Sequence, residues 1–387
     1  MATKILSVDD EVDLEMLITQ YFRRQIRKGE YEFLFAHNGN EALKQMIAHP
    51  DIDIILSDIN MPEMDGLTLL AHIREMNNPA QKCIMVSAYG DMKNIRAAMN
   101  GGAFDFATKP IDMEDLEATI EKARQQIDFV RKSQAEHNEL TDIHTDLEAA
   151  KSIQMAIVPH SFPPFPKLTD RIDLFAKMQA AKDVGGDFYD FFSIDEEHIG
   201  FIMADVSGKG VPAAIFMAVS RTVLRTIGAS STTVSDVVEA SNNMIASDSV
   251  NNMFVTVFYG TMNVTTGEIT YVNAGHNPPF ILHANGTLSI VERTGGMALG
   301  IREGLSFASK TITLEKGDTL ICYTDGVTEA FNVDYEEFGE ERLKNLLPAL
   351  KASTAEGICT KIHAAVQDFA NGAQQSDDIT LMALKRV

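Results

Sequence analysis

The stretch 112–158 constrains the fold most, because it contains neither glycine nor proline. Its apolar residues recur at alternating steps of four and three, which places them along one face of a helix. They are Leu116, Ile120, Ala123, Ile127 and Val130, and then Leu140, Ile143, Leu147 and Ala150. The segment PHSFPPFP (159–166) follows at once, and its prolines end a helix. The sequence therefore predicts one long helix between two domains.

A repeat of this kind is typical of a coiled coil, so a homodimer through 112–158 is the expected assembly. The alternative is a single helix that lies on its own domain. The length of the stretch exceeds that of a typical domain helix and favours the coiled coil. Between Val130 and Leu140 the repeat is interrupted by Gln134 and His137. There the coil is expected to be over- or underwound, as a signalling joint or merely a weak point.

Before the helix, short apolar runs rich in β-branched residues alternate with amphipathic segments. The runs lie at 4–8, 31–36, 53–56, 83–87 and 104–108, and the amphipathic segments include 12–27, 40–48 and 66–76. Strands that alternate with helices predict a parallel, doubly wound sheet, because parallel neighbours need a crossover connection. Residues 1–125 are therefore expected to form one five-stranded α/β domain, whose last helix continues into the 112–158 segment.

After the proline-rich segment the pattern changes to long alternating strands with a few helices. Strands are predicted at 253–263, 268–274, 278–284, 318–324 and 378–385, and helices at 211–227, 233–246, 340–350 and 354–369. Strands that follow one another without helices between them predict antiparallel pairing. Residues 159–387 are therefore expected to form an α+β domain, an antiparallel β-sandwich flanked by helices.

Charge and cysteine content exclude several classes of protein. The 387 residues carry a formal net charge of −22, which disfavours nucleic acid and anionic membranes as partners. The longest apolar run, Val211 to Val219, is about half of what a membrane-spanning helix needs. Three cysteines, Cys83, Cys322 and Cys359, lie far apart, as expected in a reducing compartment. The first residues, MATKILSVDD, do not read as a signal peptide, so a cytoplasmic location is expected.

In the first domain, chemically active side chains fall at the carboxyl ends of the predicted strands. Asp9 and Asp10 follow the first strand and Asp58 the third, Ser87 ends the fourth, and Lys109 follows the fifth. In a doubly wound sheet these ends meet in one crevice. Carboxylates with one open face hold Mg(II), which tolerates a phosphate ligand. The pattern therefore predicts a magnesium site at which Asp58 accepts a phosphoryl group.

Four motifs carry a family resemblance along residues 1–125: VDDE (8–11), SDINMPEMDG (57–66), VSAY (86–89) and TKP (108–110). They resemble the receiver domain of a two-component response regulator. The resemblance implies that a partner histidine kinase phosphorylates Asp58. It also implies roles for a further set of residues. Asp9, Asp10, Asp58 and the main-chain carbonyl of Asn60 would hold Mg(II), Ser87 and Lys109 would be the switch pair, and Phe106 would stand at the aromatic switch position. Many relatives have tyrosine there, and plain core is the alternative for Phe106.

In the last domain, four acidic motifs place an aspartate at a strand end or a glycine-rich turn. They are VGGDFYD (184–190), ADVSGKG (204–210), YTDGVTEA (323–330) and SDDIT (376–380). Asp187, Asp205, Asp325 and one of Asp377 or Asp378 would bring four negative charges together. Two divalent cations would neutralise them, since without metal such a cluster would repel itself or take up protons. Two such ions can activate a water and hold a phosphoryl group for in-line displacement.

Two other motifs carry weaker signals. The Lys209 of SGKGV is followed by Gly210 and not by the Ser or Thr of a phosphate-binding loop, so nucleotide binding is not predicted. His276, in NAGHNPP, is interpreted as a turn residue and not as a ligand, because it stands beside two prolines without a partner histidine.

The acidic motifs, together with YVNAGHNPP, GMALGI and FGEERL, resemble the metal-dependent protein phosphatases of the PPM family, in the SpoIIE/RsbU branch of bacterial serine/threonine phosphatases. The resemblance covers about 145–387. It implies two Mg(II) or Mn(II) ions, bridged by Asp187. It also implies that Asp205, the carbonyl of Val206, Asp325 and Asp377 complete the ligands. Relatives outside this branch have Asn where Asp378 stands, so Asp378 is the second choice for the fourth carboxylate.

The segment LEAAKSIQMAIVP (147–159) resembles the helix that precedes the catalytic domain in this branch, where it is thought to couple regulation to assembly of the metal site. A helix at the domain edge that packs Ile153 and Ile157 into the phosphatase is the alternative, and both can hold together.

These observations predict a response regulator whose output is a metal-dependent phosphoserine/phosphothreonine phosphatase. The resemblance implies a phosphorylated anti-sigma antagonist of the STAS type as its substrate. A phosphorylation-gated binding module that hydrolyses nothing is a second hypothesis. A DNA-binding regulator is a third, against which the charge of −22 and the absence of a basic helix-turn-helix count.

Overall fold

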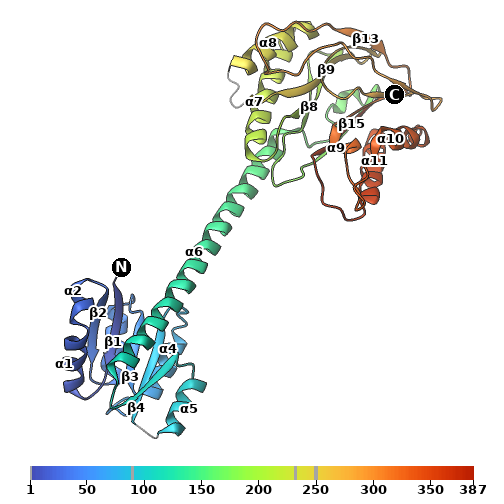
Figure 1. Ribbon diagram of the computed structural model, residues 1–387. Coiled ribbons are helices and arrows are strands. Elements are labelled where there is room, and N and C mark those ends of the chain that lie inside the picture. Colours follow the sequence, from blue (N-terminus) through green and yellow to red (C-terminus); the bar gives the residue numbers. More distant parts are fainter. Residues whose placement is uncertain (1, 89–90, 231–232, 248–251) are drawn as a thin grey trace. The chain divides into compact units, whose positions relative to one another are not determined.

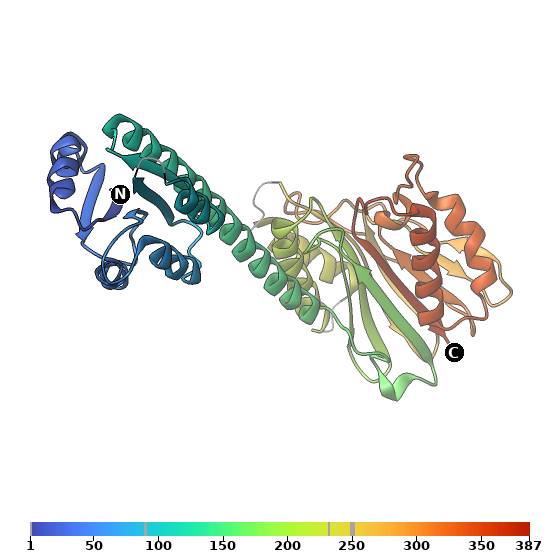
Figure 2. The same cartoon turned by 90° about the horizontal axis from the view of Figure 1, so that it is seen from below.

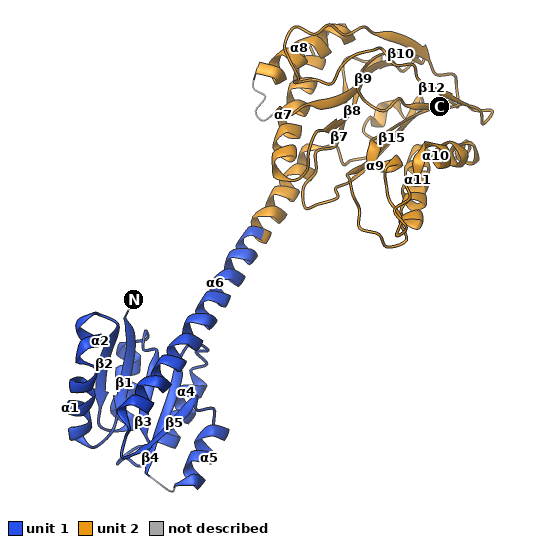
Figure 3. Cartoon of the chain, in the orientation of Figure 1, with its two compact units in different colours: residues 1–143 blue, residues 144–387 orange. Residues whose placement is uncertain are grey.

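The computed structural model describes residues 2–88, 91–230, 233–247 and 252–387. The chain divides into two compact units, residues 1–143 and 144–387 (Figure 3). Helix α6 (Met113–Ile157) contributes to both units, which confirms the long helix predicted from the absence of glycine and proline.

The first unit is built on a parallel five-stranded sheet in the order β2-β1-β3-β4-β5, as predicted. Its strands are β1 (Thr3–Val8), β2 (Tyr31–Ala36), β3 (Ile54–Asp58), β4 (Lys82–Ala88) and β5 (Asp105–Lys109). Its helices before α6 are α1 (Val12–Tyr21), α2 (Arg23–Arg27), α3 (Gly39–Ala48), α4 (Gly66–Glu75) and α5 (Met92–Asn100). The segment 12–27 was expected to be one helix, but Phe22 separates α1 from α2 and buries its ring in the core.

Helices cover both faces of this sheet (Figure 1), and a hydrophobic layer lies between the sheet and the helices on each face. Helices α3, α4 and α5 pack on one face, while α1 and the first part of α6 pack on the other. The buried residues of α6 in this second layer are Leu116, Ile120, Ala123 and Ile127. This half of the repeat therefore packs on its own domain, which is the alternative to a coiled coil.

The second half of the repeat differs, because part of it has no apolar cover in the described chain. Leu140 is 66% exposed and Ile143 is 50% exposed. Two exposed large apolar side chains one helical turn apart are what a coiled-coil partner would cover. Dimerisation through this part of α6 stays a prediction.

The second unit contains two antiparallel sheets, as predicted. One has the strand order β13-β10-β9-β8-β7 and the other β12-β11-β14-β15-β6. The strands of the first are β7 (Phe188–Ser193), β8 (His198–Val206), β9 (Val255–Asn263), β10 (Glu268–Ala274) and β13 (Lys310–Thr313). Those of the second are β6 (Ile172–Gln179), β11 (Phe280–Leu282), β12 (Leu288–Ile290), β14 (Thr319–Tyr323) and β15 (Ile379–Arg386).

Four layers make up this unit, and Figure 2 shows the helices outside the sheets. One core lies between the two sheets. A second core joins the β7–β10 sheet to α7 (Val211–Gly228) and α8 (Val234–Ser247), and a third joins the other sheet to α10 (Gly339–Leu346) and α11 (Ala355–Ala370). The remaining helices are short: η1 (Pro166–Leu168), α9 (Asp325–Thr328) and η2 (Leu347–Leu350). This arrangement confirms the predicted β-sandwich flanked by helices.

Among the described residues, α7 is the one helix long and apolar enough to pass as a membrane span by composition. One face of it is buried in the core through Ala213, Met217 and Leu224. Its other half carries Arg221 and Arg225, which form ion pairs with a carboxylate of β7. These contacts are those of a core helix.

Candidate functional site

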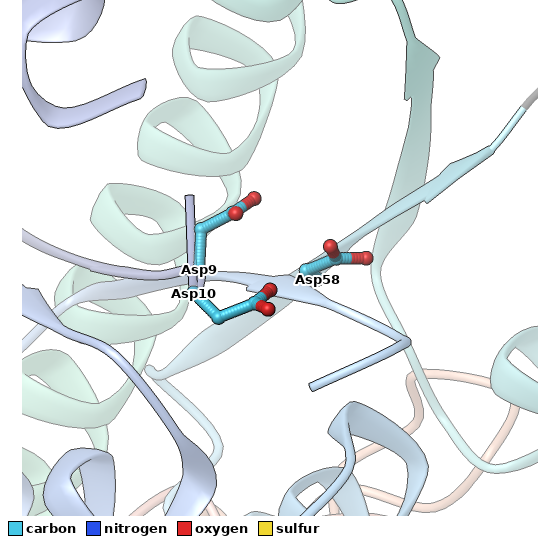
Figure 4. Close-up of side chains that lie close together, drawn as sticks. All are labelled: Asp9, Asp10 and Asp58. Atoms are coloured by element: carbon cyan, nitrogen blue, oxygen red, sulfur yellow. The ribbon is translucent and has the colours of Figure 1, made fainter. Parts of the chain in front are cut away.

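The first site lies at the carboxyl ends of the parallel strands, where the sequence placed it. Asp9 and Asp10 follow β1 and Asp58 ends β3, and each offers a carboxylate oxygen within 4.8 Å of the other two (Figure 4). Asp9 and Asp58 are each 6% exposed, whereas Asp10 is exposed. Burial raises the pKa of Asp9 above its ordinary value, although Lys109 acts against this. A hard divalent cation fits such a set of oxygen ligands.

Lys109, at the end of β5, reaches into this cluster. Its Nζ lies 2.7 Å from Asp58 Oδ2, 2.9 Å from Asp9 Oδ2 and 3.1 Å from Glu11 Oε1. Burial lowers the pKa of Lys109, but its hydrogen bonds to the three carboxylates outweigh this and the pKa is raised. The ammonium group is therefore charged at neutral pH and positioned against the predicted phosphoacceptor.

The other predicted residues of this site follow β3 directly or lie in the neighbouring strands β4 and β5. The backbone N–H of Asn60 donates to Asp58 Oδ1 at 3.2 Å. Ser87 Oγ is buried and lacks a hydrogen-bond partner within the described chain, so it is available to an incoming phosphoryl oxygen. Phe106 is 36% exposed, so the alternative that it belongs to the core is wrong. Tyr89, the last residue of the VSAY motif, lies outside the described residues.

The second site lies where both antiparallel sheets bring an aspartate to the same end. Asp187 directly precedes β7, and Asp205 stands near the end of the neighbouring β8. Asp325 opens α9 just after β14, and Asp377 precedes the neighbouring β15. Strand pairing places Asp187 beside Asp205 in one sheet and Asp325 beside Asp377 in the other. The packing of the two sheets brings these two pairs to one site, although they are far apart in the sequence.

Asp187 is the most deeply buried of these carboxylates, at 2% exposure. Its Oδ2 accepts hydrogen bonds from Thr324 Oγ1 and Thr380 Oγ1, both at 2.7 Å. Burial and the charges of Asp205 and Asp378 raise its pKa well above the ordinary value. Two hydroxyls thus orient one side of the carboxylate, while the surroundings disfavour its charge.

The pKa values of the neighbouring carboxylates are raised for the same reasons. Burial and the charge of Asp325 raise the pKa of Asp205 to about 7, although a hydrogen bond with Asp187 acts against this. Burial and the charge of Asp377 likewise raise the pKa of Asp325. Without metal, these carboxyl groups therefore keep protons at a pH at which ordinary carboxyl groups are ionised. Divalent cations would neutralise the same negative charges, because hard divalent ions prefer charged oxygen ligands.

The two adjacent aspartates of SDDIT have different surroundings. Asp378 is 8% exposed, and its carboxylate accepts backbone N–H groups of Ala181 at 2.8 Å, Gly186 at 2.7 Å and Asp187 at 3.3 Å. Asp377 is more open, with 32% of its side chain exposed, and pairs with Lys209 Nζ at 2.8 Å. Asp378 is thus committed to holding the backbone beside Asp187, and Asp377 is the carboxylate available to an ion.

The carbonyl of Val206, a predicted metal ligand, lies close to the backbone of Gly186, next to Asp187. A Cβ on Gly186 would lie 2.9 Å from the carbonyl oxygen of Val206, closer than real Cβ contacts come. Only glycine therefore allows this oxygen to lie against the residue next to Asp187.

The second site includes contacts that the sequence analysis missed. Gln154 of α6 is 5% exposed, and its Nε2 donates to the carbonyl oxygen of Gly185 at 2.6 Å while its Oε1 accepts from Gly185 N–H at 3.1 Å. The helix thus holds the residue two places before Asp187. The alternative for this segment, a helix that packs Ile153 and Ile157 into the phosphatase, is wrong for Ile153, which is 64% exposed, while Ile157 is partly buried. Helical spacing alone marked apolar positions and therefore overlooked a buried amide.

His276 lies in the connection between β10 and β11 and is 3% exposed. Its Nδ1 is 2.9 Å from Thr256 Oγ1, and its backbone N–H donates to Asn273 Oδ1 at 2.8 Å. Burial lowers its pKa to about 4, so the ring is neutral at physiological pH. These local bonds suit the predicted turn residue.

Comparison with known proteins agrees with this division of the chain. The family model for the response regulator receiver domain matches residues 5–121, and the model for Stage II sporulation protein E (SpoIIE) matches residues 195–387. The chain therefore carries a response regulator receiver domain followed by a phosphatase domain of the SpoIIE type.

The chain is 31% identical to protein IcfG of Synechocystis sp. over 268 residues, which cover 62% of this chain and 41% of IcfG. It is 29% identical to the phosphoserine phosphatase RsbU of Bacillus subtilis over 248 residues, which cover 63% of this chain and 71% of RsbU. The match thus spans less than half of IcfG and most of RsbU.

Solved structures agree on the fold. The RsbU and RsbW domains of a Mycobacterium tuberculosis protein align with a TM-score of 0.50 at 27% identity, over 56% of this chain and 60% of that one. The SiaA-PP2C domain of Pseudomonas aeruginosa aligns with a TM-score of 0.55 at 18% identity, over 64% of this chain and 98% of that one. The second likeness shows a shared fold alone.

The raised pKa values predict how metal and pH act on stability. Between the ordinary value of 3.8 and about 7, the folded chain keeps a proton on Asp205 that the unfolded chain loses. The free energy of unfolding of the metal-free chain should therefore fall as pH rises through this range. Metal binds the deprotonated carboxylates, so Mn(II) should raise the melting temperature more at high pH than at low pH.

Differential scanning calorimetry in EDTA and in Mn(II), from about pH 5 to about pH 8, measures both slopes. Asp205→Asn removes the titrating group and should flatten the metal-free slope. Identical slopes for this variant and the wild-type chain would contradict the assignment of the proton to Asp205.

Proposed function

We propose that this chain is a response regulator in which phosphorylation of Asp58 controls a metal-dependent phosphoserine/phosphothreonine protein phosphatase. The observation that carries the proposal is the carboxylate cluster around the buried Asp187 and the partly buried Asp205, where burial and neighbouring negative charges raise the pKa of both groups. The likeness to RsbU, a phosphoserine phosphatase, supports the activity. Mg(II) or Mn(II), two ions in the phosphatase site and Mg(II) in the receiver, are the proposed cofactors.

The residues of the second site suit hydrolysis of a phosphate ester. Asp187, Asp205, Asp325, Asp377 and the carbonyl of Val206 would hold the ions. Bound divalent ions would supply an activated water and neutralise the charge of the phosphoryl group. The chain's own part is to fix these ligands: Thr324 and Thr380 orient Asp187, and Asp378 holds the backbone beside it.

The receiver residues suit transfer of a phosphoryl group to Asp58. Asp9, Asp10 and the carbonyl of Asn60 would hold Mg(II) beside it, and Lys109 and Ser87 would contact the added phosphate. A histidine kinase is the proposed donor. For the substrate we propose a phosphorylated STAS-type anti-sigma antagonist, in line with the likeness to RsbU and to the phosphoserine phosphatase RsbP of Bacillus subtilis. A cytoplasmic location is also proposed, supported by three buried, free cysteines.

Loading the receiver with beryllofluoride, which mimics the acyl phosphate, should change the rate of Mn(II)-dependent phosphoprotein hydrolysis. Asp58→Asn cannot form the acyl-phosphate mimic, so its rate should be the same with and without beryllofluoride. Both are measured as phosphate release from a phosphoserine protein by the full chain. Equal rates for the loaded and free wild-type chain would contradict receiver control. No hydrolysis in any state would instead favour a phosphorylation-gated binding module.

A homodimer through α6 is the proposed assembly, because Leu140 and Ile143 lack apolar cover within the described chain. Replacing both by glutamate should convert a dimeric mass to a monomeric one in light scattering, since like charges would face each other across the seam. Lys132→Glu, on an exposed part of the same helix, is the matched control and should leave the mass unchanged. A monomeric wild-type chain, both free and beryllofluoride-loaded, would contradict the proposal.

A further inference from the structure

Lys209 lies in the short loop between β8 and α7 and extends to the second acidic site. Its Nζ is 2.8 Å from Asp377 Oδ2 and donates to the carbonyl oxygen of Ser376 at 2.5 Å. The side chain is 41% exposed, so it reaches the carboxylate from the solvent side. A lysine ammonium thus stands on the one carboxylate of the SDDIT motif that is available to an ion.

The backbone on both sides of Lys209 has conformations that glycine adopts readily. Gly208 has a φ of 91° and Gly210 a φ of 78°, and an added Cβ on either would meet nothing within 4 Å. The loop is fastened before this point, because Ser207 exchanges hydrogen bonds with the backbone of Phe254 at 2.9 and 3.0 Å. Residues 208–210 are therefore an unpacked turn with glycine freedom at both ends, and Lys209 is at its centre.

The charge of Lys209 also reaches the neighbouring ligand. Burial and the charge of Asp377 raise the pKa of Asp325, and the charge of Lys209 acts in the opposite direction. The ammonium thus supplies on this side of the cluster part of the positive charge that a divalent ion would bring. An ion that takes Asp377 Oδ2 as its ligand would compete with Lys209 for this oxygen, because the other oxygen, Oδ1, already accepts the backbone N–H of Asp378 at 2.9 Å.

We propose that the ammonium group of Lys209 competes with a divalent ion for the carboxylate of Asp377. Metal binding then includes the release of Lys209, and with it the 208–210 turn, from this carboxylate. The inference rests on the proposed phosphatase metal site and adds a positioning residue to it. The turn leads directly into α7, which begins at Val211. The affinity for metal is therefore tied to the position of the loop at the start of this helix.

Isothermal titration of the full chain with Mn(II) tests the proposal without any measure of hydrolysis. Every variant carries Asp10→Asn, which weakens the receiver site, so that the titration reports the phosphatase site. Lys209→Gln should bind Mn(II) about threefold to fivefold more tightly than the background chain, the upper part of the range expected for loss of one partly exposed ion pair. Lys209→Arg keeps the charge and should stay within about twofold of the background.

Lys167→Gln, at an exposed lysine in η1, changes the net charge by the same amount and should leave the affinity unchanged. Equal or weaker Mn(II) binding by Lys209→Gln would overturn the competition. The same gain in Lys167→Gln would also overturn it, because net charge would then explain the effect. Absence of Mn(II) binding in the background chain would instead overturn the phosphatase metal site itself, so the two failures are distinguishable.

Discussion

Asp187→Asn should abolish phosphoprotein hydrolysis and at the same time stabilise the metal-free chain. Loss of the charge that would bridge the two ions should lower the rate by at least about 10³-fold, since electrostatic stabilisation of the reacting phosphoryl group depends on it. Stabilisation is expected because burial and neighbouring charges raise the pKa of this carboxyl, so its ionised form is unfavourable without metal. The amide oxygen of asparagine can still accept the two threonine hydroxyls at 2.7 Å.

Asp190, three residues further along the chain and in β7, offers a matched contrast. It is 0% exposed and pairs with Arg221 Nε at 2.9 Å and Arg225 Nη1 at 2.6 Å. Asp190→Asn should therefore destabilise the chain by about 2 kcal/mol, less than a fully buried pair would cost because both arginines are partly exposed. Chemical denaturation in EDTA at about pH 8 measures both variants. If Asp187→Asn destabilised the chain as much as Asp190→Asn, the first carboxylate would be a structural residue and not part of an uncompensated metal site.

Much of the architecture could be predicted because local sequence patterns indicate its strands and helices. Four of the five strand ends of the receiver carry Asp9, Asp58, Ser87 and Lys109, and parallel topology requires such ends to converge. The long helix followed from the absence of glycine and proline. What the repeat could not show is which partner each half has. Ile120 packs on its own domain while Ile143 is exposed, and this depends on where the helix leaves the receiver sheet, not on the spacing.

The aspartates of the second site could be predicted from the sequence, but the surroundings of each aspartate could not. Asp377 and Asp378 are adjacent and of the same residue type, so the sequence does not distinguish their roles. They differ because the segment that leads into β15 turns the carboxylate of Asp378 toward backbone N–H groups and leaves that of Asp377 open. Strand β8 was recognised only through its motif, and the 12–27 segment hid the break at Phe22, since one buried ring does not disturb a helical spacing. Gln154 is neither apolar nor charged, so neither the apolar spacing of the helix nor the acidic motifs indicate its contact with Gly185.

Gln154→Ala is expected to disconnect the receiver from the phosphatase. Gln154 is the buried polar residue of α6 that contacts the loop before Asp187, through the paired hydrogen bonds with Gly185 at 2.6 and 3.1 Å. Gly185 packs closely against the carboxylate of Asp378, since a Cβ there would collide with it, and the same carboxylate holds Gly186. A displacement of α6 would therefore move this loop, and with it Asp187, through Gln154.

Removal of the amide should leave beryllofluoride binding by the receiver intact, while the ratio of loaded to free phosphatase rates falls to about one. The variant also leaves a buried N–H and C=O unpaired, which costs about 1–3 kcal/mol of stability. Gln154→Glu tests the two hydrogen bonds separately. An ionised glutamate can still accept from Gly185 N–H, but it cannot donate to the carbonyl oxygen of Gly185.

Lys151→Ala, on the exposed face of the same helix, controls for general damage to α6 and should keep the wild-type ratio. Rates with and without beryllofluoride, together with melting temperatures, decide the outcome. A wild-type ratio in Gln154→Ala would show that the receiver acts on the metal site by another route. A ratio near one in Gln154→Ala, with a wild-type ratio in Lys151→Ala, would place the coupling at a single buried amide, because the two substitutions differ in whether the altered side chain touches Gly185.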